Sequence, residues 1–180
     1  YKKGTVSGGL RFDNRSVNSK AFFEGTEEKF KAFTRSFANI SGSLGVSYEP
    51  ADQVTVKANI ARGFRAPTLA ELASNGTHEG TNRYEYGTTE LKSETSLQLD
   101  GGIDLDYEHF SLGFSAFYNR INDFIFYRKL ESLSGGDSLV TVDGEDIQAF
   151  QFSQHNAQLS GLEFTLDIHP HPIHWLHFEN

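Results

Sequence analysis

The sequence predicts an all-β fold, in which antiparallel strands form part of the wall of a transmembrane β-barrel. Three observations support this prediction: apolar and polar residues alternate along several segments, long polar connections alternate with short turns, and aromatic residues gather near the short turns. We expect about seven or eight strands in such a wall.

The alternation has a period of two. In residues 54–60, valine, alanine and isoleucine occupy the even positions, and threonine, lysine and asparagine the odd ones. Because successive side chains of a strand point to opposite sides, each such segment has one apolar and one polar face. The alternating segments are residues 40–48, 54–60, 97–107, 110–119 and 162–168, and weaker strand candidates are residues 5–13, 146–153 and 173–179. The polar face carries Lys57, Asp100, Asp104, Glu163 and Asp167 and would meet water in a soluble protein or a hydrated lumen in a barrel.

The predicted connections differ in length in a regular order. The long polar stretches are residues 14–37, 62–93 and 120–155, and the short turns are residues 49–52, 107–109 and 169–172. Loops in compact soluble domains are mostly about 4–6 residues long. Outer-membrane barrels instead combine short periplasmic turns with long extracellular loops. The best helical candidate is a single short turn at residues 67–73.

Aromatic residues lie close to the predicted short turns. Tyr48, Tyr107, Phe110 and Trp175 would all sit near one edge of the sheet. There they could form the interfacial girdle of a barrel or close the end of a soluble core. The alternation of loop lengths favours the girdle.

Composition excludes several classes. The chain of 180 residues has no cysteine, so it can form neither a disulfide nor a thiolate metal site. Its net charge of −8 argues against binding to nucleic acid. No run approaches the roughly 18 apolar residues of a membrane helix. The chain starts without methionine or a signal peptide, so we expect the native start to lie upstream or to have been removed.

The most specific stretch is residues 61–72, which read Ala-Arg-Gly-Phe-Arg-Ala-Pro-Thr-Leu-Ala-Glu-Leu. It resembles the "FRAP" box of TonB-dependent outer-membrane receptors, and the matching residues are Arg62, Gly63, Phe64, Arg65, Ala66, Pro67, Glu71 and Leu72. Residues 90–95 resemble the family's "NPxLKPE" box, with Thr88 and Thr89 in place of Asn-Pro and Ser93 in place of the second proline. Residues 160–176 resemble a barrel strand, a periplasmic turn and the next strand. The likeness spans roughly residues 40–180.

The resemblance implies a fragment of a Gram-negative outer-membrane receptor, with residues 1–180 as one partial barrel segment. A plug domain and the remaining strands of a barrel of roughly 22 strands would be absent. The whole receptor would bind a nutrient and import it actively, driven by the TonB complex acting on the plug. Iron complexes (ferric siderophore or haem) are the commonest cargo, so we expect one of these, with carbohydrate and cobalamin as the alternatives. Outer-membrane lipid would surround the wall, and the open edges of an isolated fragment would favour self-association.

The same resemblance suggests binding residues. Receptors resembling haem transporters place an important histidine in the interval that contains His78, and imidazole is a common ligand of haem iron. Siderophore and zinc receptors resemble the chain at this position too. Tyr84 and Tyr86 could offer phenolate or stacking contacts, or pack the loop. Arg65 would shape the base of a long loop, where Pro67 stops the strand and Gly63 permits a bend; the alternative is a direct ligand contact by Arg65.

Other polar groups predict no chemistry. His169, His171, His174 and His177 fall on both faces of a strand, so we expect a polar turn and not a metal site. Asp143, Gly144, Glu145 and Asp146 should form a solvated loop in which weak cation binding is an alternative. No catalytic motif or bound cofactor is predicted, so the chain should not be an enzyme. The alternative to a receptor is a soluble β-sandwich that binds carbohydrate or a cell surface.

Overall fold

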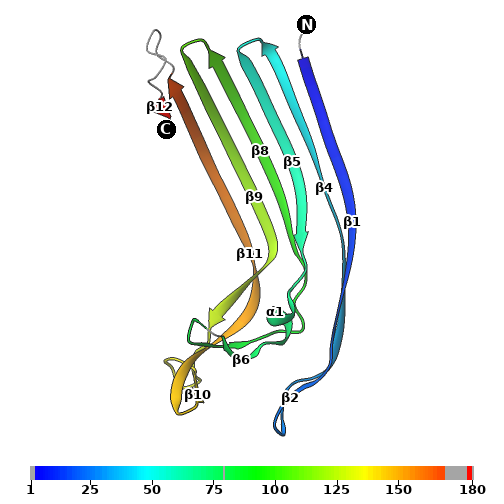
Figure 1. Cartoon of the computed structure of the whole chain (residues 1–180), viewed down its shortest axis with the longest axis vertical. Coiled ribbons are helices and arrows are strands. Elements are labelled where there is room, and N and C mark those ends of the chain that lie inside the picture. The colour runs from blue at the N-terminus through cyan, green and yellow to red at the C-terminus, as the bar shows by residue number, and fades with distance from the viewer. Residues whose placement is uncertain (1–2, 79, 169–177, 180) are drawn as a thin grey trace.

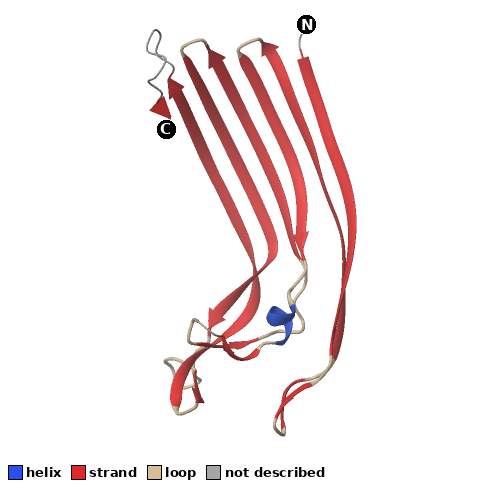
Figure 2. Ribbon diagram, viewed as in Figure 1, coloured by secondary structure: helices blue, strands red, loops and turns tan. Residues whose placement is uncertain are grey.

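The computed structural model describes residues 3–78, 80–168 and 178–179, and most of them belong to one tall antiparallel sheet (Figures 1 and 2). Six long strands lie in the order β1-β4-β5-β8-β9-β11. They are β1 (Lys3–Ser19), β4 (Phe33–Ala51), β5 (Val54–Arg65), β8 (Glu94–Tyr107), β9 (Phe110–Lys129) and β11 (Glu145–Ile168). In the described part of the chain β1 and β11 do not pair with each other, so the sheet is open, as expected for part of a barrel wall.

The remaining elements are short and lie mostly at one end of the sheet (Figure 1). They are β2 (Phe22–Glu24), β3 (Glu27–Phe30), α1 (Leu69–Ala73), β6 (Asn75–His78), β7 (Arg83–Tyr86), β10 (Leu139–Val142) and β12 (Phe178–Glu179). The predicted helical turn at residues 67–73 is confirmed as α1. In the described part of the chain no helix has the length and apolarity needed to cross a membrane.

One face of the sheet is apolar across strand boundaries, because the register aligns the apolar positions of neighbouring strands. Tyr48, Val56, Ile103, Phe114 and Phe164 are successive partners in one cross-strand row. Their exposed fractions run from 38% for Val56 to 54% for Phe164. We call this side of the long strands the apolar face. Exposing such a row to water would cost free energy, because a fold gains about 0.8 kcal/mol for each CH₂ group that it removes from water.

The opposite side, the polar face, carries the charges predicted there. Lys57 Nζ lies 2.5 Å from the Asp104 carboxylate. Asp100 accepts hydrogen bonds from Asn59 Nδ2 at 3.0 Å and from Gln98 Nε2 at 2.7 Å. The polar face is therefore a layer of ion pairs and hydrogen bonds that can contact water, and it is not a hydrophobic core.

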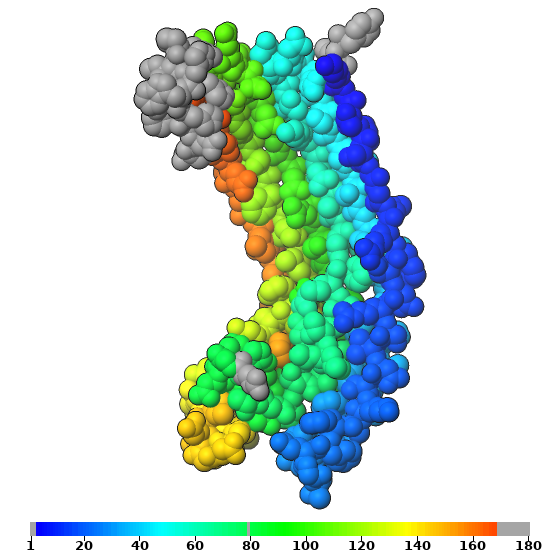
Figure 3. Space-filling view, in the orientation of Figure 1, coloured from blue at the N-terminus to red at the C-terminus, as the bar shows by residue number. Residues whose placement is uncertain are grey.

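The soluble β-sandwich alternative does not fit this architecture (Figure 3). In the part of the chain that the structure describes, no second sheet packs on the apolar face. The accessible surface is 12564 Å². A compact soluble monomer of 20.1 kDa would expose about 8,700 Å². The excess surface is that of a single-layer wall exposed on both sides.

Several strands are longer than predicted. β1 continues to Ser19 and β9 to Lys129, while β11 already begins at Glu145. The predicted loops at residues 14–37 and 120–155 therefore had the wrong bounds. The extension of β1 over residues 14–19 is mostly polar, so alternation of apolar residues cannot detect it. The extension of β9 carries apolar residues on both faces, including Ile125 of a buried cluster, so it has no period of two either. Residues 146–153 and 162–168, predicted as two separate segments, are parts of one strand, and a register shift between His155 and Ala157 interrupts the alternation between them.

The turns follow the prediction more closely. The short connections after Ala51 and Tyr107 are confirmed, whereas residues 169–172 and most of residues 173–179 lie outside the described residues. Asp143 and Gly144 join β10 to β11 with φ angles of 51° and 86°. Two positive φ angles are the requirement of a tight two-residue hairpin turn. The predicted acidic loop is thus a hairpin turn.

Three of the predicted girdle residues lie on the apolar face at the short-turn end. The rings of Tyr107 and Phe110 stack with centroids 5.1 Å apart, and Tyr48 lies one hairpin away. All three side chains are exposed. Trp175 lies outside the described residues.

Candidate functional site

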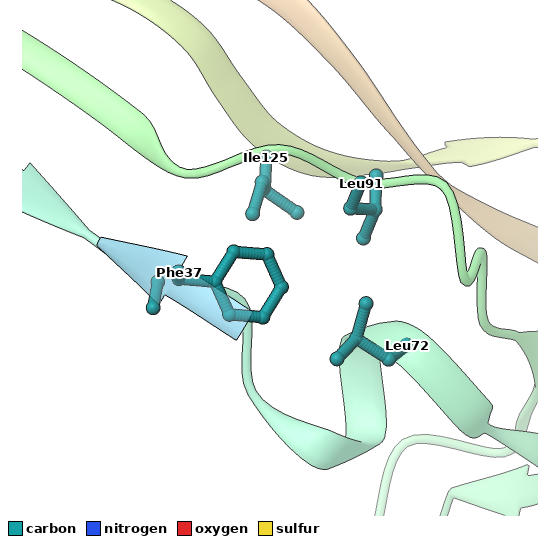
Figure 4. Close-up of a cluster of buried hydrophobic side chains, with 5 residues drawn as sticks. Phe37, Leu72, Leu91 and Ile125 are labelled. Carbon is teal, nitrogen blue, oxygen red and sulfur yellow. The ribbon is translucent and has the colours of Figure 1, made fainter. Parts of the chain in front are cut away.

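The loop end of the sheet holds the main cluster of buried apolar side chains among the described residues. Four side chains of this cluster point toward one another (Figure 4). They are Phe37 of β4, Leu72 of α1, Leu91 of the connection before β8, and Ile125 of β9, and Ala66 completes the cluster. Leu72 is only 1% exposed. The connection between β5 and β8 is therefore folded onto the strands and anchored there.

Arg65, a predicted site residue, joins three elements at this place. Its Nε and Nη2 donate to the two Glu94 oxygens at 2.8 and 2.7 Å. Its Nη1 donates to both Glu71 oxygens at 2.9 Å. Glu94 Oε1 also accepts the backbone N–H of Ile125 at 2.6 Å. This ion cluster ties β5, α1, β8 and β9 together, which supports a structural role for Arg65.

Hydrogen bonds within the ion cluster stabilise the ionised forms of Arg65 and Glu71. The hydrogen bonds to Glu94 raise the pKa of the Arg65 guanidinium, and those to Glu71 add to the effect. Burial alone would raise the pKa of Glu71, but hydrogen bonds from Arg65 and from the Thr68 backbone outweigh it and leave that pKa below its ordinary value. Arg65 and Glu71 therefore stay ionised at neutral pH.

The sequence of the first box explains how α1 starts. Pro67 has no backbone N–H and cannot continue a ladder, and β5 ends at Arg65 as predicted. Thr68 caps the helix: its Oγ1 accepts the Glu71 N–H at 3.2 Å, and Glu71 Oε2 accepts the Thr68 N–H at 2.7 Å. Gly63 forms no bend, because it pairs with Ser96 in unbroken register. A Cβ at Gly63 would lie 3.0 Å from Ser96 Oγ, so close packing accounts for the glycine.

The degraded second box is also held in place. Thr88, which stands where the family has asparagine, donates through Oγ1 to the Phe152 carbonyl at 2.7 Å. Arg35 Nη2 donates to the Leu91 carbonyl at 3.1 Å. The side chain of Gln154 accepts from the Lys92 N–H and donates to its carbonyl, both at 2.8 Å. The loss of both prolines is thus compatible with an ordered segment.

A groove of about 400 Å³ lies between α1, β6 and the β2–β3 hairpin. His78 lines it together with aromatic and polar side chains from the hairpin, namely Phe22, Phe30 and Lys29. The two phenylalanine rings stack with centroids 5.7 Å apart. Asn75 Nδ2 donates to the Lys29 carbonyl at 2.7 Å, which ties the hairpin to β6. The groove offers an aromatic wall beside an imidazole.

The four predicted site residues do not form one cluster. His78 lies in the groove, and its Nδ1 is 3.2 Å from Thr81 Oγ1. Tyr84 is 8% exposed and donates through its hydroxyl to Asn75 Oδ1 at 3.0 Å, while burial raises the pKa of its phenol. Tyr84 is therefore a protonated phenol that packs the loop. Tyr86 lies against Tyr84 with ring centroids 5.1 Å apart, and Arg65 belongs to the ion cluster.

The sequence reasoning missed the β2–β3 hairpin, whose residues fell inside a predicted long loop. A signal was present: Phe22 and Phe30 flank a polar turn at Gly25, which has a φ angle of 62°. Aromatic residues on both sides of a glycine turn are typical of a hairpin.

The structure gives no support to a metal site in the part that it describes. No three histidine or carboxylate side chains among residues 3–78, 80–168 and 178–179 lie close enough to hold an ion. The four histidines at positions 169, 171, 174 and 177 lie outside the described residues.

Residues 2–178 match the family model described as "TonB dependent receptor-like, beta-barrel". The ferric enterobactin receptor of Pseudomonas aeruginosa is 32% identical over 143 residues, which cover 72% of this chain and 18% of that protein. Two similar solved structures are the copper transporter OprC and a double mutant of the Serratia marcescens hemophore receptor HasR in complex with its hemophore HasA and heme. Their TM-scores are 0.69 and 0.65 at 21% and 15% identity, over 92% and 91% of this chain and 24% and 29% of theirs. These structures show the same fold.

Proposed function

Because the chain belongs to the TonB-dependent receptor-like β-barrel family, we propose that it is a wall segment of an outer-membrane receptor that imports an iron complex. Members of the family are transport receptors of the Gram-negative outer membrane and not enzymes. The chain spans about a fifth of the length of the curated relative that it matches. The activity, cargo and partners of the whole receptor are therefore part of the proposal.

The two-faced sheet is the observation that carries this proposal. An exposed apolar face across five strands requires lipid, and the polar face behind it suits a hydrated lumen. The short turns gather at one end and the packed connection with the groove at the other (Figure 1). A receptor of this family would place the groove outside the cell, where it meets the nutrient first.

We choose an iron complex, ferric siderophore or haem, as the cargo because the relative that is 32% identical is a ferric enterobactin receptor. An aromatic wall beside the imidazole of His78 suits a planar or aromatic iron ligand, by stacking or by coordination. We propose His78 and Tyr86 as the ligand-binding residues, and Arg65 and Tyr84 as residues that hold the loop in shape. Import would be driven by the TonB complex, acting on a plug domain inside the barrel.

The test is uptake of radiolabelled iron complexes by cells that carry the full-length receptor. Replacing His78 with alanine is expected to weaken binding of the transported complex about tenfold, the equivalent of about 1.4 kcal/mol. His109→Ala is the matched control, because His109 lies at the opposite, short-turn end and should leave uptake unchanged. Deletion of TonB should abolish uptake in both.

Equal uptake by the two histidine variants would overturn the role of His78. Uptake of a carbohydrate or of cobalamin, with none of ferric siderophore or haem, would overturn the iron complex as cargo.

A further inference from the structure

Two arginines, Arg62 and Arg120, lie on the apolar face. Arg62, Leu97, Arg120 and Gln158 are successive partners in one cross-strand row, which we call the arginine row. Between the short turns and this row, the apolar positions of the six described long strands carry no other charged side chain. The acidic residues of these strand segments lie on the polar face. Among the described residues of these strand segments, the charges on the apolar face are thus both positive and in the same row.

The arginine row lies at the loop-side limit of the apolar band. From Leu97 to Tyr107 the apolar positions of β8 extend about 33 Å along the strand, at about 3.3 Å per residue. With the tilt of about 35–45° that barrel strands adopt, this length covers about 25 Å across the membrane, the height of the hydrocarbon band. The row therefore lies at headgroup level in the leaflet on the loop side.

Both guanidinium groups have hydrogen-bond donors to spare. Arg120 is exposed, and the described part of the chain offers it neither an ion pair nor a hydrogen bond. Arg62 donates through Nη1 to Asn39 Oδ1 at 2.7 Å and to the Ile40 carbonyl, which leaves its Nε and Nη2 for another acceptor. One strand separates the two arginines, so their Cα atoms lie about 10 Å apart, within reach of two linked anionic groups.

An apolar groove adjoins Arg62 on the same face. β4 pairs with β5 only as far as Gly42 and Arg62, and beyond that point the two strands separate. Phe12, Ala38, Asn39 and Ile40 line the groove together with Arg62. Phe12 is 68% exposed and Ile40 55%. Phe12 and Ile40 lie one row further toward the loops than Arg62, so the groove flanks the guanidinium on its loop side and the apolar band lies on the other side.

We propose that the arginine row binds the phosphate groups of an anionic lipid in the loop-side leaflet, with Arg62 and Arg120 as the phosphate ligands. Guanidinium groups bind phosphate oxygens in bidentate fashion, which a sheet of otherwise apolar and small residues cannot do. The net charge of −8 shows that the row is no part of a generally basic surface. The proposal rests on the membrane placement in the proposed function, but not on the nutrient that is transported.

The experiment uses the full-length receptor in detergent micelles and lipid A with both phosphates as the probe, with bound lipid counted by native mass spectrometry. Arg120→Gln and Arg62→Gln are each expected to weaken lipid binding about fivefold, the effect of one basic residue near an anionic membrane surface, and the double variant about 25-fold. Arg120→Lys should recover part of the loss. The matched control is Arg11→Gln, an exposed arginine on the polar face whose partner is Asp13.

Three results would overturn the lipid site: equal affinity in Arg120→Gln and Arg11→Gln, equal binding of dephosphorylated lipid A, or complete competition by inorganic phosphate at the concentration of the lipid. Since Arg62 also joins β4 to β5, Arg120→Gln is the decisive variant. Iron uptake, measured in the same variants, separates the two proposals. Lipid binding that depends on Arg120 in a receptor that imports no iron complex would contradict the proposed cargo and leave the lipid site standing.

Discussion

Replacing Phe114 with lysine is expected to destabilise the folded barrel by about 2–4 kcal/mol, the cost of a lysine on the lipid side near the bilayer midplane. Phe114 lies on the apolar face, two rows from the stacked pair Tyr107–Phe110 and three rows from Arg120. It is exposed in the sheet, so the substitution disturbs no packed core. The free energy of unfolding would be measured by urea titration of the full-length receptor in lipid micelles.

Ser115→Lys is the matched control, one residue further along β9 and on the polar face. Its Oγ is 3.5 Å from the Glu163 carboxylate, which a lysine there could pair with. We expect a change within about 0.5 kcal/mol, as for most surface substitutions. Equal losses in the two variants would contradict the assignment of one face to lipid and the other to water.

Replacing Arg65 with alanine should have the second largest effect, a loss of about 2–3 kcal/mol in the stability of the loop base. Breaking a fully buried ion pair costs about 3–5 kcal/mol, and Arg65 is 42% exposed, so the loss should be smaller. The Glu94 carboxylate, 11% exposed, would be left without its guanidinium partner. Hydrogen exchange of residues 66–93 measures this stability directly, and protection there should fall.

Two further variants make the Arg65 experiment specific. Glu94→Gln combined with Arg65→Ala should lose less than the sum of the single changes, because both remove the same interaction. Arg11→Ala, which removes the exposed pair with Asp13, should cost under about 1 kcal/mol. If Arg65→Ala were as mild as Arg11→Ala, with no loss of protection, the structural role of Arg65 would be wrong.

The sequence predicted the fold well because a barrel strand follows a strict rule. Residues such as Val56 and Ile103 alternate with Lys57 and Asp104, and the register then brings like faces together. The proline of the first box also fixed where β5 ends and where α1 begins. These features depend on residues that are close together in the chain, so they can be predicted from the sequence.

The extent of the strands and the details of the site could not be predicted in the same way. β9 and β11 continue past the membrane level, where neighbouring residues such as Ile125 and Phe126 are apolar on both faces and the register shifts between His155 and Ala157, so no period of two marks them. The contact of Arg65 with Glu94 joins residues that are 29 positions apart and depends on pairing of β5 with β8. The burial of Tyr84 depends on β7 lying parallel to β11, a long-range contact without a local signal.

The central claim is that one face of this sheet meets lipid and the other meets water, and the most direct measurement is a spin-label scan along β8. The printed chain has no cysteine, so single cysteines from position 97 to position 105 of the full-length receptor, each in an otherwise cysteine-free background, can carry the label. In bilayers we predict that labels at positions 97, 99, 103 and 105 are relaxed by oxygen, which dissolves in lipid, and labels at 98, 100 and 104 by a water-soluble nickel chelate. Equal access of the nickel chelate to both sets would contradict the barrel wall.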